Sequence, residues 1–317
     1  MSSQPIEGTP LPDNAPQWAV AAHERLQAKT KAAKESGESL FGVLPPPGVK
    51  RVLLHSCCAP CSGAMVEEMM TAQGIENVTV FFYNPNIHPR REYEIRKQEN
   101  KVFCKQLGID FVDVDYDVEN WYARVKGMEM DAERGRRCTE CFDMRMERTA
   151  LHAHEGNFDA IATTNATSRW KDENQVDDSG DRAAAKYSNL VYWRYNWKSD
   201  EMTLRKYQIS ADRKFYKQEY CGCSPSLRDS NEWRKANGIP NIQIGGETAG
   251  LGNRYFSNAI EDAEEENQDV VDEFFAQAQE IAQAGTDRVE RKKRLETYKD
   301  RRKSEANDGI LNGLNNW

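Results

Sequence analysis

Short apolar runs alternate along this chain with longer segments whose apolar positions recur at helical spacing. The short runs have the length and the β-branched and aromatic composition of buried strands. The predicted strands are Arg51–His55, Val78–Tyr83, Asp110–Val114, Phe158–Thr164 and Leu190–Trp193. Strands that alternate with helices predict an α/β fold, with a parallel sheet flanked by helices on both faces.

The segments between these strands carry the predicted helices. They are Gly63–Gln73, Glu92–Leu107, Asn120–Lys126, Glu140–Glu155 and Lys206–Tyr220. We expect the last helix to lead directly into the pair Cys221 and Cys223. Ligands of open parallel sheets bind beyond the carboxyl ends of the strands, and the loop at residues 56–61 leaves its strand there.

The pattern divides the chain into three parts. Residues 1–48 are rich in Pro, Ser, Gly, Lys and Glu, and we expect an extended or partly disordered leader with one helix from Trp18 to Ala33. Residues 49–240 form the predicted α/β domain. Residues 241–317 are heavily charged, with helical periodicity that predicts a helical C-terminal extension.

Charge and hydropathy narrow the class of protein. The net charge is -8 and 30% of the residues are charged, which argues against a protein that grips nucleic acid by bulk charge. A polyanion contact would be local, and basic stretches occur at residues 90–101, 134–137 and 194–217. The chain has no apolar signal segment and no long uncharged apolar run, so we expect a cytoplasmic protein without membrane contact.

Cysteine spacing gives the strongest chemical signal. Seven of the eight cysteines fall into three tight groups. They are Cys57, Cys58 and Cys61; Cys138 and Cys141; and Cys221 and Cys223. Disulfide scaffolds are short secreted chains, whereas clustered thiols in a reducing compartment indicate metal ligands or redox catalysts. The eighth, Cys104, lies alone in a helical segment, and we expect it to be a small buried hydrophobe.

The number of thiols bears on which metal is bound. A [4Fe-4S] cluster or a structural zinc takes four ligands, so seven thiols exceed either need. The surplus fits a cluster with a separate metal, or a cluster with an open iron site. Two alternatives stay open at this point: a thioredoxin-like redox motif at Cys58–Cys61, which leaves the other groups unexplained, and a purely structural zinc.

Four segments in order resemble the QueH-type epoxyqueuosine reductases, over about residues 50 to 230. They are Leu53–Cys61, Phe82–Pro89 with Glu92, Tyr93 and Arg96, Arg137–Arg145 with Thr149 and Ala150, and Tyr216–Cys223. The resemblance implies a Rossmann-like fold of the HUP or ATP-pyrophosphatase type. The loop Asn165–Asp172 and the polar stretch through Ala185 depart from the family's pattern, which leaves the substrate loop unassigned.

The resemblance also implies an activity and its cofactors. Members reduce epoxyqueuosine to queuosine at the wobble position of tRNA, using a [4Fe-4S] cluster and a second mononuclear metal, expected to be iron. The implied ligands are all seven clustered cysteines. The position of Cys61 can be Asp in the family, so we expect Cys58, Cys61 and either Cys221 or Cys223 around the second metal. An unidentified low-potential electron donor is a further implied partner.

Removing an epoxide oxygen takes two electrons and two protons, so proton donors and base-binding residues are needed. Cys61, Asp143 and His55 are the catalytic candidates, because they lie in or near the cysteine groups. Stacking and polar residues would bind the splayed nucleotide of the anticodon loop. The candidates are Tyr83, Asn84, Arg136, Arg169 and Trp170, with Trp193 and Tyr195 as further stacking residues and Arg134, Arg137, Lys198 and Lys214 for phosphates.

Two other functions remain open from the sequence. One is a tRNA-modifying sulfur-transfer enzyme of the same fold, which needs a Gly-rich phosphate loop after the first strand. His55–Pro60 stands in that place, and Pro60 lacks the backbone donor that a phosphate needs. The other is a zinc-stabilised RNA-binding module without catalysis.

Overall fold

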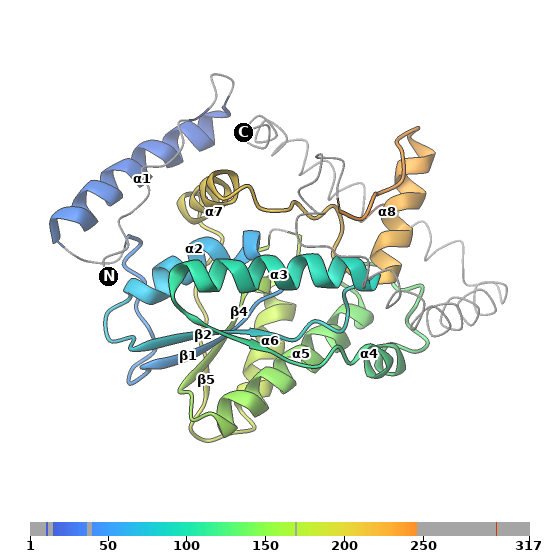
Figure 1. The fold of residues 1–317 in the computed structure, drawn as a ribbon, viewed down its shortest axis with the longest axis horizontal. Coiled ribbons are helices and arrows are strands. Elements are labelled where there is room, and N and C mark those ends of the chain that lie inside the picture. Colours follow the sequence, from blue (N-terminus) through green and yellow to red (C-terminus); the bar gives the residue numbers. More distant parts are fainter. Residues whose placement is uncertain (1–10, 12–14, 37–39, 169, 246–295, 297–317) are drawn as a thin grey trace.

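A five-stranded parallel sheet is the centre of this protein (Figure 1). The computed structural model describes residues 11, 15–36, 40–168, 170–245 and 296. The strands are β1 (Arg51–His55), β2 (Asn77–Phe82), β3 (Asp110–Asp113), β4 (Ala160–Thr163) and β5 (Val191–Tyr192). They are all parallel, in the order β3-β2-β1-β4-β5. The predicted α/β fold and all five predicted strands are therefore confirmed.

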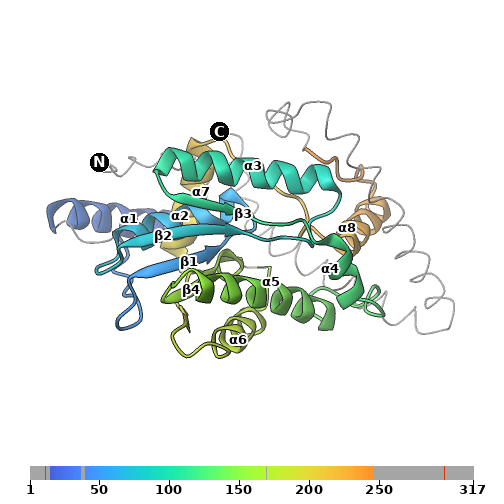
Figure 2. The ribbon, with the colours of Figure 1, turned by 60° about the horizontal axis from the view of Figure 1, so that its bottom comes forward.

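Helices cover both faces of the sheet, as Figure 2 shows. One layer contains α2 (Ala59–Thr71), α3 (Arg90–Leu107) and α7 (Asp200–Asp212), with α1 (Gln17–Ser36) packed against α7. The other layer contains α4 (Val118–Arg124), α5 (Arg136–Glu155) and α6 (Glu173–Ala184). The last described helix, α8 (Ser224–Ala236), lies near α4 (Figure 2).

Side chains of the central strands alternate between two cores. On β1, Val52 and Leu54 pack into the core that also contains Val80, whereas Leu53 packs into the core with Phe81. All of these side chains are buried. A strand buried on both faces needs a continuous apolar run, which is the pattern that predicted these strands from the sequence.

The order of the strands places two loops next to each other. The chain runs from β1 through β2 to β3, then returns to place β4 on the other side of β1. The loop after β1 and the short 3-10 turn after β4, η1 (Thr164–Thr167), therefore leave the same edge of the sheet side by side. This reversal point is where parallel α/β sheets bind their ligands.

The predicted helix Lys206–Tyr220 is wrong over its second half. Helix α7 ends at Asp212, and residues 213–223 are not helical. Lys214 adopts a positive φ of 51°, and the amides of Lys214 and Phe215 bond back to the carbonyls of Ala211 and Ser210. These two bonds form the 5→2 and 6→1 pair that ends a helix. The third cysteine group thus lies on an irregular, non-helical segment.

Helices α6 and α8 were not predicted. The stretch that contains α6 is highly polar, and its apolar positions are few. The helix is started by Asp172, whose carboxylate accepts a hydrogen bond from the amide of Gln175 at 3.1 Å. Polar contacts to α5 then hold α6 in place, and the helix has no broad apolar stripe. The spacing of apolar residues therefore did not predict it.

The two ends of the chain are only partly described. Helix α1 confirms the predicted helix Trp18–Ala33, and Arg25 on it pairs with Glu201 on α7. The predicted helical extension lies almost wholly outside the described residues, which include only 241–245 and 296 of it. The domain boundaries at 48 and 240 stay predictions. Among the described helices, none has the length and apolarity needed to cross a membrane.

Gly180→Ala should destabilise the protein by about 1–3 kcal/mol, because overpacking a buried site has this cost. A Cβ at Gly180 would lie 2.5 Å from the ring of Tyr192, which holds α6 against β5. Urea unfolding measures the change. The double variant Gly180→Ala with Tyr192→Leu is the control, since the alanine should cost less once the ring is gone. Equal costs in both backgrounds would contradict this packing.

Candidate metal centre

Three thiols gather where the chain leaves β1. The Sγ atoms of Cys57, Cys58 and Cys61 all lie within 4.8 Å of one another, and Cys57 and Cys58 are 3.7 Å apart. Four sulfurs around one tetrahedral metal at bonds of about 2.3 Å would stand about 3.8 Å apart. This first thiol group therefore has the spacing of ligands to a single metal ion.

The turn after β4 supports the first thiol group. The backbone amide of Cys57 donates to the hydroxyl of Thr164 at 3.1 Å, and that hydroxyl lies 3.5 Å from Cys57 Sγ. Thr167 donates to the carbonyl of Cys61. Hydrogen bonds of this kind orient ligands and tune the metal that they hold. The reversal of strand order is what brings η1 to these cysteines.

We call the other four clustered cysteines, Cys138, Cys141, Cys221 and Cys223, the second thiol group. The first two lie in the opening turns of α5, and the last two lie just before α8. Electrostatic interactions connect Cys138 and Cys223 with each other and with the remaining two. Burial raises the pKa of Cys138 to about 12 and that of Cys223 well above its ordinary value. A metal ion would offset that cost, since it binds the thiolate form.

The eight cysteines are all free, so the disulfide scaffold is excluded for this structure. Cys104 is 1% exposed within the apolar core, and burial raises the pKa of its thiol to about 12. Its prediction as a small buried hydrophobe is confirmed. Cys61, Cys138 and Cys221, one from each of the three sequence groups, are partly exposed as residues, and the other four clustered cysteines are buried.

Lys171 joins the two thiol groups. Its Nζ donates to Cys221 Sγ at 3.8 Å, and it interacts electrostatically with Cys57 and Cys61. Burial by itself would lower the pKa of Lys171, but these thiols raise it above its ordinary value. No motif in the sequence marked this lysine as part of the site. The order of the strands does indicate its position, because the segment after β4 leaves the sheet at the same edge as the cysteine loop.

Two buried arginines add positive charge on the α5 side. Arg137 is 1% exposed, donates to the carbonyls of Met128 and Glu129, and interacts electrostatically with Cys138 and Cys223. It is therefore not available for the phosphate contact that the sequence suggested. Arg145 is also buried and donates to the carbonyl of Cys141 at 2.9 Å. These cations favour thiolates, the form in which cysteine binds metal.

Helix α3 fixes the segment that carries Cys221. Glu92, Arg96 and Glu99 lie on one buried face of this helix, at spacings of four and three residues. Arg96 pairs with Glu92 at 2.7 Å and donates to the carbonyls of Tyr220 and Cys221 at 3.2 and 3.0 Å. Arg96 was grouped with a basic surface stretch, but it is 2% exposed and serves the interior instead.

Glu99 and Glu92 complete this anchor. The carboxylate of Glu99 accepts the amide of Tyr216 at 2.9 Å, and Glu92 accepts the Tyr216 hydroxyl at 2.8 Å. Gly222 then passes close to α3 with a φ of 132°, and a Cβ there would lie 3.2 Å from Arg96 Nη1.

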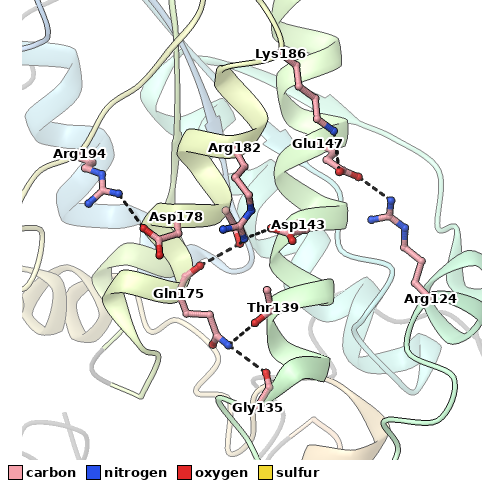
Figure 3. A network of polar contacts seen from close by, with 11 residues as sticks. Arg124, Gly135, Thr139, Asp143, Glu147, Gln175, Asp178, Arg182, Lys186 and Arg194 are labelled. Carbon is pink, nitrogen blue, oxygen red and sulfur yellow. Dashed lines mark hydrogen bonds and ion pairs between the residues drawn. The ribbon is translucent and has the colours of Figure 1, made fainter.

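Neither His55 nor Asp143 is arranged as a free proton donor. His55 is fully buried, its Nε2 lies 3.1 Å from the Tyr83 carbonyl and its Nδ1 lies 2.9 Å from the Thr163 hydroxyl. Burial, aided by the charge of Arg145, lowers its pKa to about 3, so the ring is neutral and ties β1 to β2 and β4. Asp143 points toward α6, where Arg182 binds it at 2.7 Å (Figure 3).

Figure 3 shows why α5 and α6 keep a fixed relation. Gln175 reaches from α6 to Thr139 at 2.7 Å and to the carbonyl of Gly135 at 3.1 Å. Further along α5, Glu147 pairs with both Arg124 and Lys186. The contacts of Gln175 lie directly beside the turn that presents Cys138. The unpredicted helix α6 thereby helps to set the position of the second thiol group.

The predicted substrate-binding residues fall into different environments. Tyr83 and Asn84 are buried; Asn84 Nδ2 donates to the carbonyl of Ser56 at 2.8 Å and so supports the cysteine loop, whereas the Tyr83 hydroxyl donates to Asp117 at 3.3 Å. Arg136 is largely exposed beside Asp131, and Trp170 is partly exposed and accepts a bond from Arg134 through its carbonyl. Arg169 lies outside the described residues.

The other aromatic and basic candidates also differ in exposure. Trp193 is 1% exposed in the core, whereas Tyr195 is 36% exposed. Lys198 lies 3.5 Å from Glu173. One further residue was missed by the sequence: Asn165 in η1 is 1% exposed, and both polar atoms of its side chain lack a hydrogen-bond partner in the structure. A buried polar group without a partner destabilises the folded state, and a hydrogen bond from a bound ligand or water would offset this penalty.

Comparison with known proteins identifies relatives over the same region. The epoxyqueuosine reductase QueH family matches residues 52–229. The epoxyqueuosine reductase QueH of Haemophilus influenzae is 54% identical over 200 residues, which are 63% of this chain and 81% of that protein. The proteins of the same name from Acinetobacter baylyi and Thermotoga maritima are 50% and 29% identical, covering 63% and 57% of this chain and 91% and 92% of their own lengths.

Arg96→Met should lower the free energy of unfolding by about 3–5 kcal/mol, because it leaves Glu92 as an uncompensated buried charge. It should also release the segment of Cys221 and reduce the metal content. Urea unfolding of the metal-free protein and elemental analysis of the purified protein measure the two effects. Arg90→Met, which breaks a partly exposed pair on the same helix, is the matched control. Equal stability and metal content in both variants would contradict the anchoring role.

Proposed function

This chain belongs to the epoxyqueuosine reductase QueH family, and from that premise we propose that it reduces epoxyqueuosine to queuosine at the wobble position of tRNA. The observation that carries the proposal is the close approach of three thiols at the reversal point of the sheet, within 4.8 Å of one another, beside a lysine that also bonds to Cys221. A thiol-rich centre is suited to the transfer of electrons that an epoxide deoxygenation requires.

The donor set fits a [4Fe-4S] cluster and a second metal. Four thiolates hold such a cluster, and the second thiol group supplies four. The first thiol group has the close spacing of ligands to one ion, and we assign it to the second metal, which we propose to be iron. This division differs from the one suggested by sequence, which placed Cys221 or Cys223 with the second metal.

When bound, the metals would supply electrons at low potential and a Lewis acid for the epoxide oxygen. The protein's own part is to hold the thiolates and to compensate their charge. Thr164 hydrogen-bonds Cys57, while Lys171, Arg137 and Arg145 place positive charge near both groups. Cys61 stays a catalytic candidate because it is a partly exposed residue of the first thiol group.

We propose that the substrate approaches from the side of the partly exposed cysteines. Arg134 lies beside Cys138, whose Sγ accepts its backbone amide at 3.3 Å, and its side chain donates to the carbonyl of Trp170. Arg136 is exposed next to it. We propose that these residues and Arg169 meet the phosphates and bases of the anticodon loop, in the way that arginine and aromatic side chains recognise unpaired RNA.

Anaerobically purified protein should be brown and contain iron and inorganic sulfide. Cys138→Ala should abolish the visible absorbance because it removes a cluster ligand, whereas Cys58→Ala should lose the second metal and keep the cluster. Elemental and sulfide analysis with absorbance spectra measures both. Cys104→Ala is the control, since that thiol lies in the apolar core. A colourless protein that contains zinc alone would instead support the structural zinc module.

Arg136→Ala should weaken binding of the unmodified anticodon stem-loop and reduce the slope of log affinity against log salt by about one. The cause is the loss of one phosphate contact by an exposed guanidinium. Fluorescence anisotropy over a salt series measures both quantities. Arg25→Ala, which removes an exposed arginine from α1, is the control. If the two variants bind equally well, this surface does not contact the RNA.

A further inference from the structure

We propose that Lys171 is the charge shared by the two thiol groups, and that it raises the reduction potential of the iron-sulfur cluster held there. This role rests on the proposed function, because it concerns the cluster that we assign to the second thiol group. It adds a positioning residue that acts on electron transfer through its contact with a ligand sulfur.

The geometry of Lys171 distinguishes it from the two nearby arginines. Arg137 and Arg145 direct their hydrogen bonds to backbone carbonyls, at Met128, Glu129 and Cys141. Lys171 instead directs its Nζ to a thiol sulfur, Cys221 Sγ, at 3.8 Å. The ammonium of Lys171 therefore bonds directly to a proposed cluster ligand. The hydrogen bonds of the two arginines go to carbonyls instead.

Lys171 also acts on the first thiol group. It interacts electrostatically with Cys57 and Cys61, while Cys221 belongs to the second thiol group. The ammonium of Lys171 therefore interacts electrostatically with ligands of both proposed metals. A change of charge at either metal would alter the electrostatic energy of this lysine, which also stabilises the other metal.

The surrounding chain holds Lys171 in this place. It follows Trp170, whose carbonyl accepts a bond from Arg134, and it precedes Asp172, which caps α6. The segment is thus tied at one side to the turn before α5 and at the other to the helix that packs on α5. This support makes the lysine part of the built centre rather than a surface side chain that happens to reach it.

The physical effect follows from charge. A thiolate-ligated cluster gains negative charge when it is reduced, and its potential depends on net charge, on hydrogen bonds to the sulfurs and on exposure to water. A partly buried ammonium beside a ligand sulfur stabilises the reduced state more than the oxidised state. Removing this charge should therefore make the cluster harder to reduce.

The test compares Lys171→Met and Lys171→Arg with the unaltered protein. Spectroelectrochemical titration of the anaerobic protein gives the midpoint potential, and iron and sulfide analysis gives cluster occupancy. We expect Lys171→Met to lower the equilibrium constant for reduction by about tenfold, a shift of about 59 mV to more negative potential for one electron. Lys171→Arg should stay close to the unaltered protein. Lys186→Met, which removes a lysine paired with Glu147, is the matched control.

Each outcome separates this inference from the proposed function. An unchanged potential in Lys171→Met, with full iron, would overturn the inference and leave the proposed function standing. Unaltered protein without an iron-sulfur cluster would overturn the proposed function itself. If Lys171→Met cannot hold iron, the Lys171→Arg variant decides. Iron retained at the original potential supports the role of the positive charge. Iron lost in this variant as well overturns the inference, because the shape of the lysine side chain and not its charge would then be required.

Discussion

The buried pair of Glu92 and Arg96 on α3 is the constraint on which the rest of the centre depends. Such a pair is costly to bury and must be fully hydrogen-bonded to be tolerated. Here the remaining donors of Arg96 are used on the carbonyls of Tyr220 and Cys221, and Glu92 also accepts the Tyr216 hydroxyl. The hydrogen bonds that offset the burial of Arg96 therefore also fix the irregular segment that carries Cys221 and Cys223.

The same helix reaches the other side of the centre. Asn100, one turn beyond Arg96, accepts the hydroxyl of Ser56 at 2.7 Å, directly before Cys57. The sheet brings the loop after β1 beside η1, and α3 brings residues 220–223 to the same edge. The first thiol group results, and Lys171 interacts both with it and with Cys221 of the second thiol group. The sulfur ligands thus lie at the edge where open parallel sheets generally bind their ligands.

The sequence predicted the strands, the α/β fold and the cysteine groups because each leaves a local mark: an apolar run, or thiols at short spacing. It did not reveal α6, because that helix depends on polar contacts such as those of Gln175. Nor did it reveal the buried roles of Arg96, Arg137 and Lys171, since a charged residue in a polar stretch looks the same whether it faces water or a thiolate. Those roles arise only when distant segments meet. The implied HUP relationship and the assignment of each ligand stay predictions.

Anomalous diffraction from crystals of the anaerobic protein, measured on both sides of the iron absorption edge, tests the central claim most directly. The account predicts iron in both places, with a four-iron peak among Cys138, Cys141, Cys221 and Cys223 and a separate metal peak among Cys57, Cys58 and Cys61. A map with no iron at either thiol group, or with a single zinc shared between them, would contradict it.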